Sequence, residues 1–299
     1  MDSVIVAIPN DGALAEELGK KGSQNGITYY NRKVGGNAIV IVTPTDASSK
    51  FYAVGEIMTM ADVVVISTSS LDQLFGESVI IASLLGKKTI FTDDNDVSTI
   101  LKSAKMDGYE ISGRKELAEK LGAFSRDPSQ STGELRIDID KSFPVKGVGT
   151  VLLGIVRSGK VKVHDTLHSS GGIEVPVRSI QVHDEDQQEA LSGDRVGLAV
   201  KGVDHDSIGK GDILSKDKRL RVESIRAEIR KSPLAKDMEI DGLNCTLVSG
   251  FSAVNCKISK DEDAYSVKME KPVSLWKGDC FVLTREKAPR AFASGTVLG

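Results

Sequence analysis

The sequence of 299 residues predicts an α/β N-terminal domain followed by two small antiparallel β-barrels. The first observation is that short β-branched runs alternate with helix-like stretches over residues 1–124. The second is that, after a polar linker, the pattern changes to period-two alternation with frequent glycine turns. A chain of this length also exceeds one typical domain, so two or three domains are expected.

Four short runs rich in β-branched residues alternate with helical patterns in the N-terminal part. Each run is nearly continuous in apolar residues, which is typical of strands buried on both faces of a parallel sheet. Strand–helix alternation of this kind predicts an open sheet with right-handed crossovers. The expected strands are Val4–Ile8, Ala38–Val42, Val63–Ser67 and Thr89–Thr92, and the expected helices are Gly12–Lys20, Leu71–Leu85, Ser98–Met106 and Arg114–Leu121.

The loops that follow the four strands are where a ligand is expected, because open α/β sheets bind ligands at the carboxyl ends of their strands. The first loop, Ile8–Gly12, has one glycine and no following Lys-Ser/Thr pair. It therefore fits neither GxGxxG nor GxxxxGK[ST]. Asp11 would repel a phosphate at the helix start, and we interpret it as part of an Asn/Asp N-cap. No nucleotide-binding residue is predicted.

The fourth loop is acidic and reads Asp93-Asp94-Asn95-Asp96. It lacks the glycine and the later glutamate of a calcium loop. We interpret it as a solvated strand-to-helix turn in which Asn95 or Asp96 caps the next helix. His164 and His168 are four residues apart, but they lie in a β segment with no adjacent third ligand. No GxSxG elbow occurs either. We expect no catalytic residue, no metal site and no cofactor.

A polar linker at Ser125–Gly133 is the best domain boundary in the chain. Beyond it, Leu135, Ile137 and Ile139 occupy every second position with polar partners between them, as on a half-buried strand. Short strands separated by glycine turns predict a small antiparallel barrel. The expected domains are residues 1–124, 134–217 and 218–299.

The segment Asp140–Gly159 (DKSFPVKGVGTVLLGIVRSG) resembles the opening of domain 2 of elongation factor Tu. It meets every fixed position of the pattern D-x-x-F-x-[VI]-x-G-x-G-T-V-x-x-G-x-V-x-x-G. Gly193–Leu214 resembles the closing strands of the same barrel. Arg219–Leu298 resembles domain 3 of that family more weakly, with a length closer to that in the selenocysteine-specific elongation factor. The glycines permit tight turns at barrel corners, so these patterns predict a fold and not a chemistry.

By the same resemblance, the N-terminal sheet is similar to a P-loop GTPase domain with a degenerate nucleotide site. Such a domain would place DxPG at Val42–Asp46, where only Pro44 survives. It would place NKxD at Asp93–Asp96, where no Asn-Lys pair occurs. These GTPases also have a Ser-Ala-Lys loop after the last strand. In this chain only Ser112 matches that loop. The resemblance therefore implies a pseudo-GTPase and not an enzyme.

Archaeal elongation-factor-like proteins with an eroded nucleotide site are similar to this chain in Glu17–Gly22 and Ile27–Asn31. The resemblance implies a translation elongation factor-like protein that binds tRNA or the ribosome through its β-barrels. In elongation factors the first barrel receives the aminoacyl end of tRNA and also contacts the ribosome. Two alternatives are open: a protein-interaction or regulatory module that uses the pseudo-GTPase domain, and GTP binding by a non-standard site.

Basic side chains around the first hairpin of the first barrel are the candidate RNA-binding residues, because they could meet RNA phosphates. A solvated hairpin face with ordinary lysines is the alternative interpretation. The net charge of −3 gives no overall basic field that would draw the chain onto nucleic acid, and DNA is not an expected partner. The candidates are Lys146, Arg157, Lys160 and Lys162.

Three further observations predict a cytoplasmic protein with no membrane partner. The apolar runs are far too short to span a bilayer. The start of the chain runs into a strand-like VIVAI without the features of a signal peptide. The cysteines form no CxxC pair and are odd in number, as expected of reduced interior thiols. They are Cys245, Cys256 and Cys280.

Overall fold

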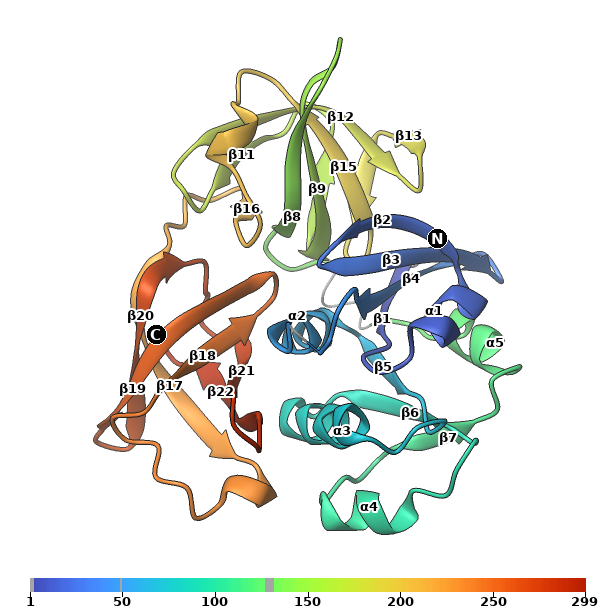
Figure 1. Ribbon diagram of the computed structural model, residues 1–299. Helices are drawn as coiled ribbons and strands as arrows, with labels where there is room; N and C mark the ends of the chain where they lie inside the picture. The colour runs from blue at the N-terminus through green and yellow to red at the C-terminus, as the bar shows by residue number, and fades with distance from the viewer. Residues whose placement is uncertain (1–2, 49, 127–131) are drawn as a thin grey trace.

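The computed structural model describes residues 3–48, 50–126 and 132–299. Figure 1 shows an N-terminal sheet with its helices on one side of the molecule and two β units packed against it. The central part of the linker expected at Ser125–Gly133, residues 127–131, lies outside the described residues. Among the described residues, no helix is long and apolar enough to cross a membrane.

The N-terminal sheet has the strand order β2-β3-β4-β1-β5-β6-β7. The pairs from β4 through β1, β5, β6 and β7 are parallel, whereas β2 and β3 add antiparallel strands at one edge. The four expected strands are confirmed as β1, β4, β5 and β6. The strands are β1 (Ser3–Ala7), β2 (Lys20–Asn25), β3 (Ile27–Val34), β4 (Asn37–Pro44), β5 (Val63–Ile66), β6 (Lys88–Thr92) and β7 (Glu110–Ser112).

Of the five helices in the described part of this unit, four were expected from the sequence, and each of the four is shorter than expected. The helix predicted to reach Met106 ends at Ser103, and Lys105 has the left-handed φ of 51° that breaks a helix. The helix α2 was missed, because all its residues from Ala53 to Met60 are buried and leave no amphipathic pattern. The helices are α1 (Gly12–Leu18), α2 (Tyr52–Met60), α3 (Gln73–Leu85), α4 (Ser98–Ser103) and α5 (Leu117–Gly122).

The first barrel comprises β8 to β16. Its strands pair in the order β11-β16-β8-β9-β15-β12, and the additional pairing of β11 with β12 joins the two ends of this row. The strands are β8 (Arg136–Val145), β9 (Gly149–Ser158), β10 (Lys160–Lys162), β11 (Thr166–Ser169), β12 (Glu174–Val182), β13 (Glu185–Gln187), β14 (Glu189–Leu191), β15 (Arg195–Val200) and β16 (Ile213–Ser215), with the 3-10 helix η1 (His205–Ser207).

The second barrel comprises β17 to β22, which close in the order β17-β20-β19-β18-β21-β22. The expected fold class, an open α/β sheet followed by two antiparallel barrels, is therefore confirmed. The strands are β17 (Val222–Lys231), β18 (Asn244–Ser249), β19 (Ser252–Asp261), β20 (Ala264–Val273), β21 (Cys280–Thr284) and β22 (Ala291–Val297), with the 3-10 helix η2 (Pro233–Ala235).

The helices α2 and α3 lie between the N-terminal sheet and the second barrel (Figure 1). The hydrophobic core around them includes Phe251 and Val282 of the second barrel, together with Ile155 of the first. The fit is close at Gly55 of α2, where an added Cβ would lie 3.1 Å from Val248. The three parts therefore share apolar core and do not meet only through polar surfaces.

Strand β8 corrects one expectation about surface exposure. Its apolar residues Ile137 and Ile139 face the barrel core, as the alternation predicts. Their polar neighbours Asp138 and Asp140 are also buried, with 3% and 1% of their surface exposed. The outer face of β8 is covered by neighbouring parts of the molecule, and buried carboxylates require charged partners. Asp138 accepts a hydrogen bond from Arg136 at 2.7 Å, and Asp140 lies 3.5 Å from Arg195.

Candidate functional site

The loop after β1 is tied to the loop after β5 by a reciprocal pair of hydrogen bonds. The Asn10 amide donates to the Ser67 carbonyl at 2.7 Å, and the Ser67 backbone N–H donates to the Asn10 side-chain oxygen at 3.0 Å. Asp11 accepts the Leu14 N–H at 2.8 Å and is the N-cap of α1. The Asn/Asp N-cap interpretation of this loop is confirmed for Asp11.

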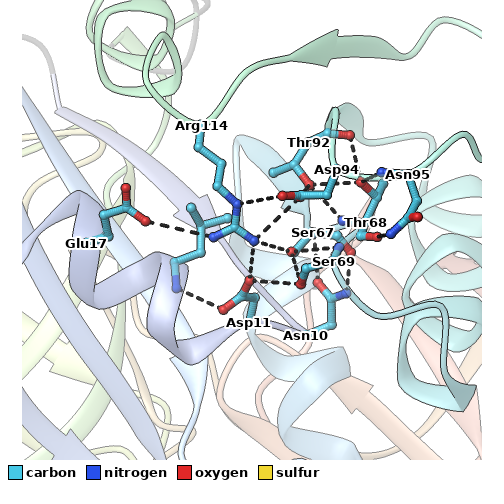
Figure 2. A network of polar contacts seen from close by, with 11 residues as sticks. Asn10, Asp11, Glu17, Ser67, Thr68, Ser69, Thr92, Asp94, Asn95 and Arg114 are labelled. Atoms are coloured by element: carbon cyan, nitrogen blue, oxygen red, sulfur yellow. Dashed lines mark hydrogen bonds and ion pairs between the residues drawn. The ribbon is translucent and has the colours of Figure 1, made fainter.

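One arginine from the loop after β7 occupies the carboxyl edge of the sheet (Figure 2). Arg114 donates to Asp94 at 3.0 Å, to Asp11 at 3.1 Å and to Ser67 at 3.2 Å. Its guanidinium also lies 3.8 Å from Glu17. We call Asp11, Ser67, Asp94 and Arg114 the Arg114 cluster. It joins loops that follow β1, β5, β6 and β7 of the sheet.

The charges of the Arg114 cluster stabilise one another. For Asp94, the hydrogen bond from Thr92 and the contact with Arg114 lower the pKa of the carboxyl against a smaller effect of burial. For Asp11, burial raises the pKa, but the Leu14 N–H, the Ser67 hydroxyl and the Arg114 guanidinium together outweigh it and the pKa is lowered. The same contacts raise the pKa of Arg114. Both carboxylates are therefore ionised at neutral pH and held by one cation.

A second set of hydrogen bonds links the loops after β5 and β6. The Thr68 N–H donates to the Thr92 hydroxyl at 2.7 Å, and the Asn95 side chain donates to the Thr68 carbonyl at 2.8 Å. Asp96 accepts the N–H of Ser98, the first residue of α4, at 2.9 Å. The acidic loop is thus a strand-to-helix turn held by Thr68, Arg114 and the start of α4. The expected cap at Asn95 or Asp96 was wrong, because the N-cap of α4 is Val97, which makes no side-chain capping hydrogen bond.

This edge presents two carboxylates and a neutralised guanidinium where a nucleotide would need free donors. Walker-type sites cradle phosphates with backbone N–H groups and a lysine. Here Asp11 caps α1, and the Arg114 guanidinium already contacts Asp11 and Asp94. A phosphate entering this position would face both carboxylates. The arrangement cross-links the loops that follow β1, β5, β6 and β7.

One group of side chains in the described part of the chain could hold a metal ion. It consists of Asp204, His205 and Asp206, whose ligand atoms lie within 4.8 Å of one another at the surface. Exposed acidic groups of this kind are common without an ion. His164 and His168, the histidines four residues apart, are outside this group.

The four candidate RNA-binding residues lie on separate parts of the first barrel. Lys146 is exposed in the turn between β8 and β9, whereas Arg157 lies at the other end of β9, a strand that spans roughly 30 Å. Lys160 and Lys162 lie together on β10, where Lys162 is 3.7 Å from Glu189. The sequence could not show how far apart these side chains lie, because residues that are close in sequence become separated along a ten-residue strand.

Arg157 is held in a contact between the first barrel and the N-terminal unit. Its guanidinium donates to the carbonyls of Met60 and Thr59 at the end of α2 and lies 3.9 Å from Asp138. Cations near a helix carboxyl terminus complement its exposed carbonyls. The position of Arg157 is therefore that of a structural contact.

Lys146 instead lines a groove of about 880 Å³ at the end of the first barrel, which we call the barrel-end groove. Arg178 and Lys201 line the same groove, and none of its lining residues is acidic. Arg178 donates to the carbonyl of Val148 at 3.2 Å, which ties β12 to the β8–β9 turn. Arg178 and Lys201 could not be predicted from the sequence as part of this groove, because they approach Lys146 only when the barrel closes. The apolar lining includes Val145, Val148, Val200 and Val203.

The open mixed sheet with two antiparallel barrels is the architecture of translation elongation factors. The crystal structure of a bacterial selenocysteine-specific elongation factor EF-Sec superimposes with a TM-score of 0.83 at 18% identity, over 99% of this chain and 58% of that one. The model of the family described as elongation factor Tu domain 2 matches residues 149–215.

Sequence comparison extends this relationship. The chain is 30% identical over 276 residues to the uncharacterized protein MJ0325 of Methanocaldococcus jannaschii, covering 89% of each chain. It is 46% identical over 90 residues to the selenocysteine-specific elongation factor of the same organism, covering 29% of this chain and 19% of that protein. The chain belongs to the family of elongation factor Tu and the selenocysteine-specific elongation factors.

Proposed function

We propose that this protein binds an RNA of the translation apparatus, tRNA or ribosomal RNA, through its first barrel, in the cytoplasm and without hydrolysing GTP. The observation that carries the proposal is the barrel-end groove, where Lys146, Arg178 and Lys201 surround an apolar surface without a carboxylate. Cations of this kind neutralise phosphates, and apolar walls accept the faces of bases. Relatives that match part of the chain are translation elongation factors, which supports an RNA of translation as the ligand.

The Arg114 cluster supports the second half of the proposal. In a GTPase of this family the loops after β1, β6 and β7 would surround the nucleotide. In this chain Asp11, Asp94 and Arg114 from these loops bind one another instead. We therefore expect calorimetry of the full chain with GTP and GDP to show no binding at micromolar concentrations. Micromolar affinity would favour nucleotide binding by a non-standard site.

The test of RNA binding compares two pairs of lysines on the same barrel. Lys146→Ala/Lys201→Ala removes two charges from the groove and is expected to weaken tRNA or ribosome binding about tenfold. It should also reduce the slope of log affinity against log salt by about 2, because each lysine that is removed leaves one phosphate without its cation. Binding is measured by filter retention of tRNA and by co-sedimentation with ribosomes between about 50 and 200 mM KCl.

The matched control is Lys160→Ala/Lys162→Ala, which removes two exposed lysines of β10 outside the groove. It should retain affinity to within twofold. Equal losses in both variants would show a general charge effect and contradict the groove. Absence of RNA binding by the unmodified chain, with co-purification of a protein instead, would favour a protein-interaction module.

A further inference from the structure

A second basic cavity lies where the N-terminal unit meets the second barrel. It has a volume of about 490 Å³ and is lined by the carboxyl end of α3, by Lys105 after α4, and by the segment from Arg230 to Lys236 at the end of β17 and in η2. In Figure 1 this orange segment lies beside one end of α3. We call it the α3–β17 cavity. It is separate from the barrel-end groove, which the first barrel forms alone.

Four cations line the α3–β17 cavity, and none of its lining residues is acidic. None of the four forms an ion pair within the described parts of the chain. This local excess contrasts with the net charge of −3 for the whole sequence. Cations that converge on one concave site attract anions. The cations are Lys105, Arg230, Lys231 and Lys236.

Two of these cations are positioned by hydrogen bonds to backbone carbonyls. Arg230 donates to the Ser83 carbonyl at 2.8 Å and to that of Leu84, at the carboxyl end of α3. Lys231 donates to the Met238 carbonyl at 3.0 Å. The end of a helix carries partial negative charge, and Arg230 offsets it here. These contacts hold the two side chains in place, and neither side chain forms an ion pair within the described residues.

Ser232 adds a buried polar side chain to the α3–β17 cavity. Ser232 is fully buried, and its hydroxyl has no hydrogen-bond partner among the described residues. Its backbone N–H and carbonyl are both satisfied, by Phe292 and Ala235. A buried hydroxyl without a partner costs free energy, so it is usually satisfied by a partner in the working molecule. Ser232 lines the same cavity as the four cations.

We propose that the α3–β17 cavity binds a phosphorylated anion with two or three linked phosphoryl groups. Four cations match the charge of such a group, and the volume exceeds what a single phosphate needs. Arg230 can offer its remaining N–H groups as a fork, and the lysines supply point charges around it. The Ser232 hydroxyl donates to a phosphoryl oxygen. The ligand would bridge α3 and α4 to the second barrel.

The test is isothermal titration of the full chain with inorganic tripolyphosphate at low salt. Lys105→Asn/Lys236→Gln removes two of the three exposed cations, with asparagine chosen because it tolerates the positive φ of Lys105. We expect at least tenfold weaker binding in this variant. Ser232→Ala, which loses one hydrogen bond, is expected to weaken binding about fivefold.

The matched control is Lys257→Gln/Lys268→Gln, two exposed lysines that face each other across β19 and β20 of the same barrel and lie outside the cavity. It should bind tripolyphosphate as the unmodified chain does. No heat of binding in the unmodified chain, or the same loss in the control, would overturn the proposal.

A competition arm identifies the source of the phosphates. If a single-stranded RNA oligonucleotide displaces tripolyphosphate and depends on Lys105 and Lys236, the ligand is a nucleic-acid backbone. If it does not displace tripolyphosphate, the ligand is a free phosphorylated compound. RNA binding that depends on Lys146 and Lys201 alone takes place in the barrel-end groove. Such binding does not change the outcome of the tripolyphosphate titration at the α3–β17 cavity.

Discussion

Lys210→Met is expected to lower the free energy of unfolding by about 3 kcal/mol at pH 9 and by much less at pH 6. Lys210 follows η1 in the first barrel, and its Nζ lies 2.8 Å from an oxygen of Glu56 on α2. Glu56 is 1% exposed. The variant leaves this carboxylate buried without its cation. The measurement is urea denaturation at several pH values between 5 and 9.

The pH dependence follows from the pKa of Glu56. Burial raises this pKa from 4.5 to about 7, although Lys210 acts in the opposite direction. The folded protein therefore binds a proton that the unfolded chain loses near pH 4.5. Stability falls as pH rises from about 4.5 to 7 and is then constant with respect to this group. Without Lys210 the pKa of Glu56 rises further, so the fall continues to higher pH.

The double variant Glu56→Gln/Lys210→Met is the control for this prediction. A neutral amide has no charge to bury, so the double variant should recover most of the stability lost at pH 9. The free energy of unfolding of the double variant should also lack the decline with rising pH that Glu56 causes above about pH 4.5. A loss that is equal at pH 6 and pH 9, or one that the glutamine does not rescue, would show that Lys210 acts by packing alone.

Arg114→Met is expected to lower the free energy of unfolding by about 2 kcal/mol at neutral pH. Arg114 is the cation shared by Asp11 and Asp94, and these side chains are partly exposed, so the effect is smaller than for a fully buried pair. Methionine keeps much of the apolar stem and removes the charge. The two carboxylates then repel each other without a counterion. Chemical denaturation measures the loss.

Acidification tests the electrostatic cause of this effect. In the unmodified chain the pKa values of Asp11 and Asp94 lie below 3.8, so their stabilising effect is present above that pH and lost as pH falls through the lower values. The difference between Arg114→Met and the unmodified chain should therefore shrink toward pH 3. Lys115→Met, at an exposed neighbouring residue, is the control and should change stability little. A difference independent of pH would contradict the ion-pair explanation.

The strands of the N-terminal unit and most of its helices could be predicted, because each of these elements has a local sequence signature. Continuous β-branched runs indicate buried parallel strands, and leucines at helical spacing indicate half-buried helices. The helix α2 lacks a polar face because it is enclosed by the sheet and the second barrel. Local pattern cannot distinguish such a helix from another buried segment.

The candidate sites were less predictable, because they depend on which loops meet. Asp11 could be identified as a cap from its position before a helix. Its partner Arg114 is 103 residues further along the chain, and nothing in the local sequence of either joins them. Lys146, Arg178 and Lys201 likewise come from three separate segments of the first barrel. Which basic residues share a surface therefore depends on how the barrel closes, and not on their spacing in the sequence.

By itself, the sequence determined the class of each part and the family to which the chain belongs. Period-two alternation places Ile137 and Ile139 on one face of β8 and Asp138 and Asp140 on the other, because side chains alternate along a strand. Only the tertiary structure decided what covers the second face. It buries both aspartates beside arginines and holds Arg157 against the end of α2. Alternation specifies which residues share a face, whereas exposure depends on segments that are distant in sequence and meet only in the folded chain.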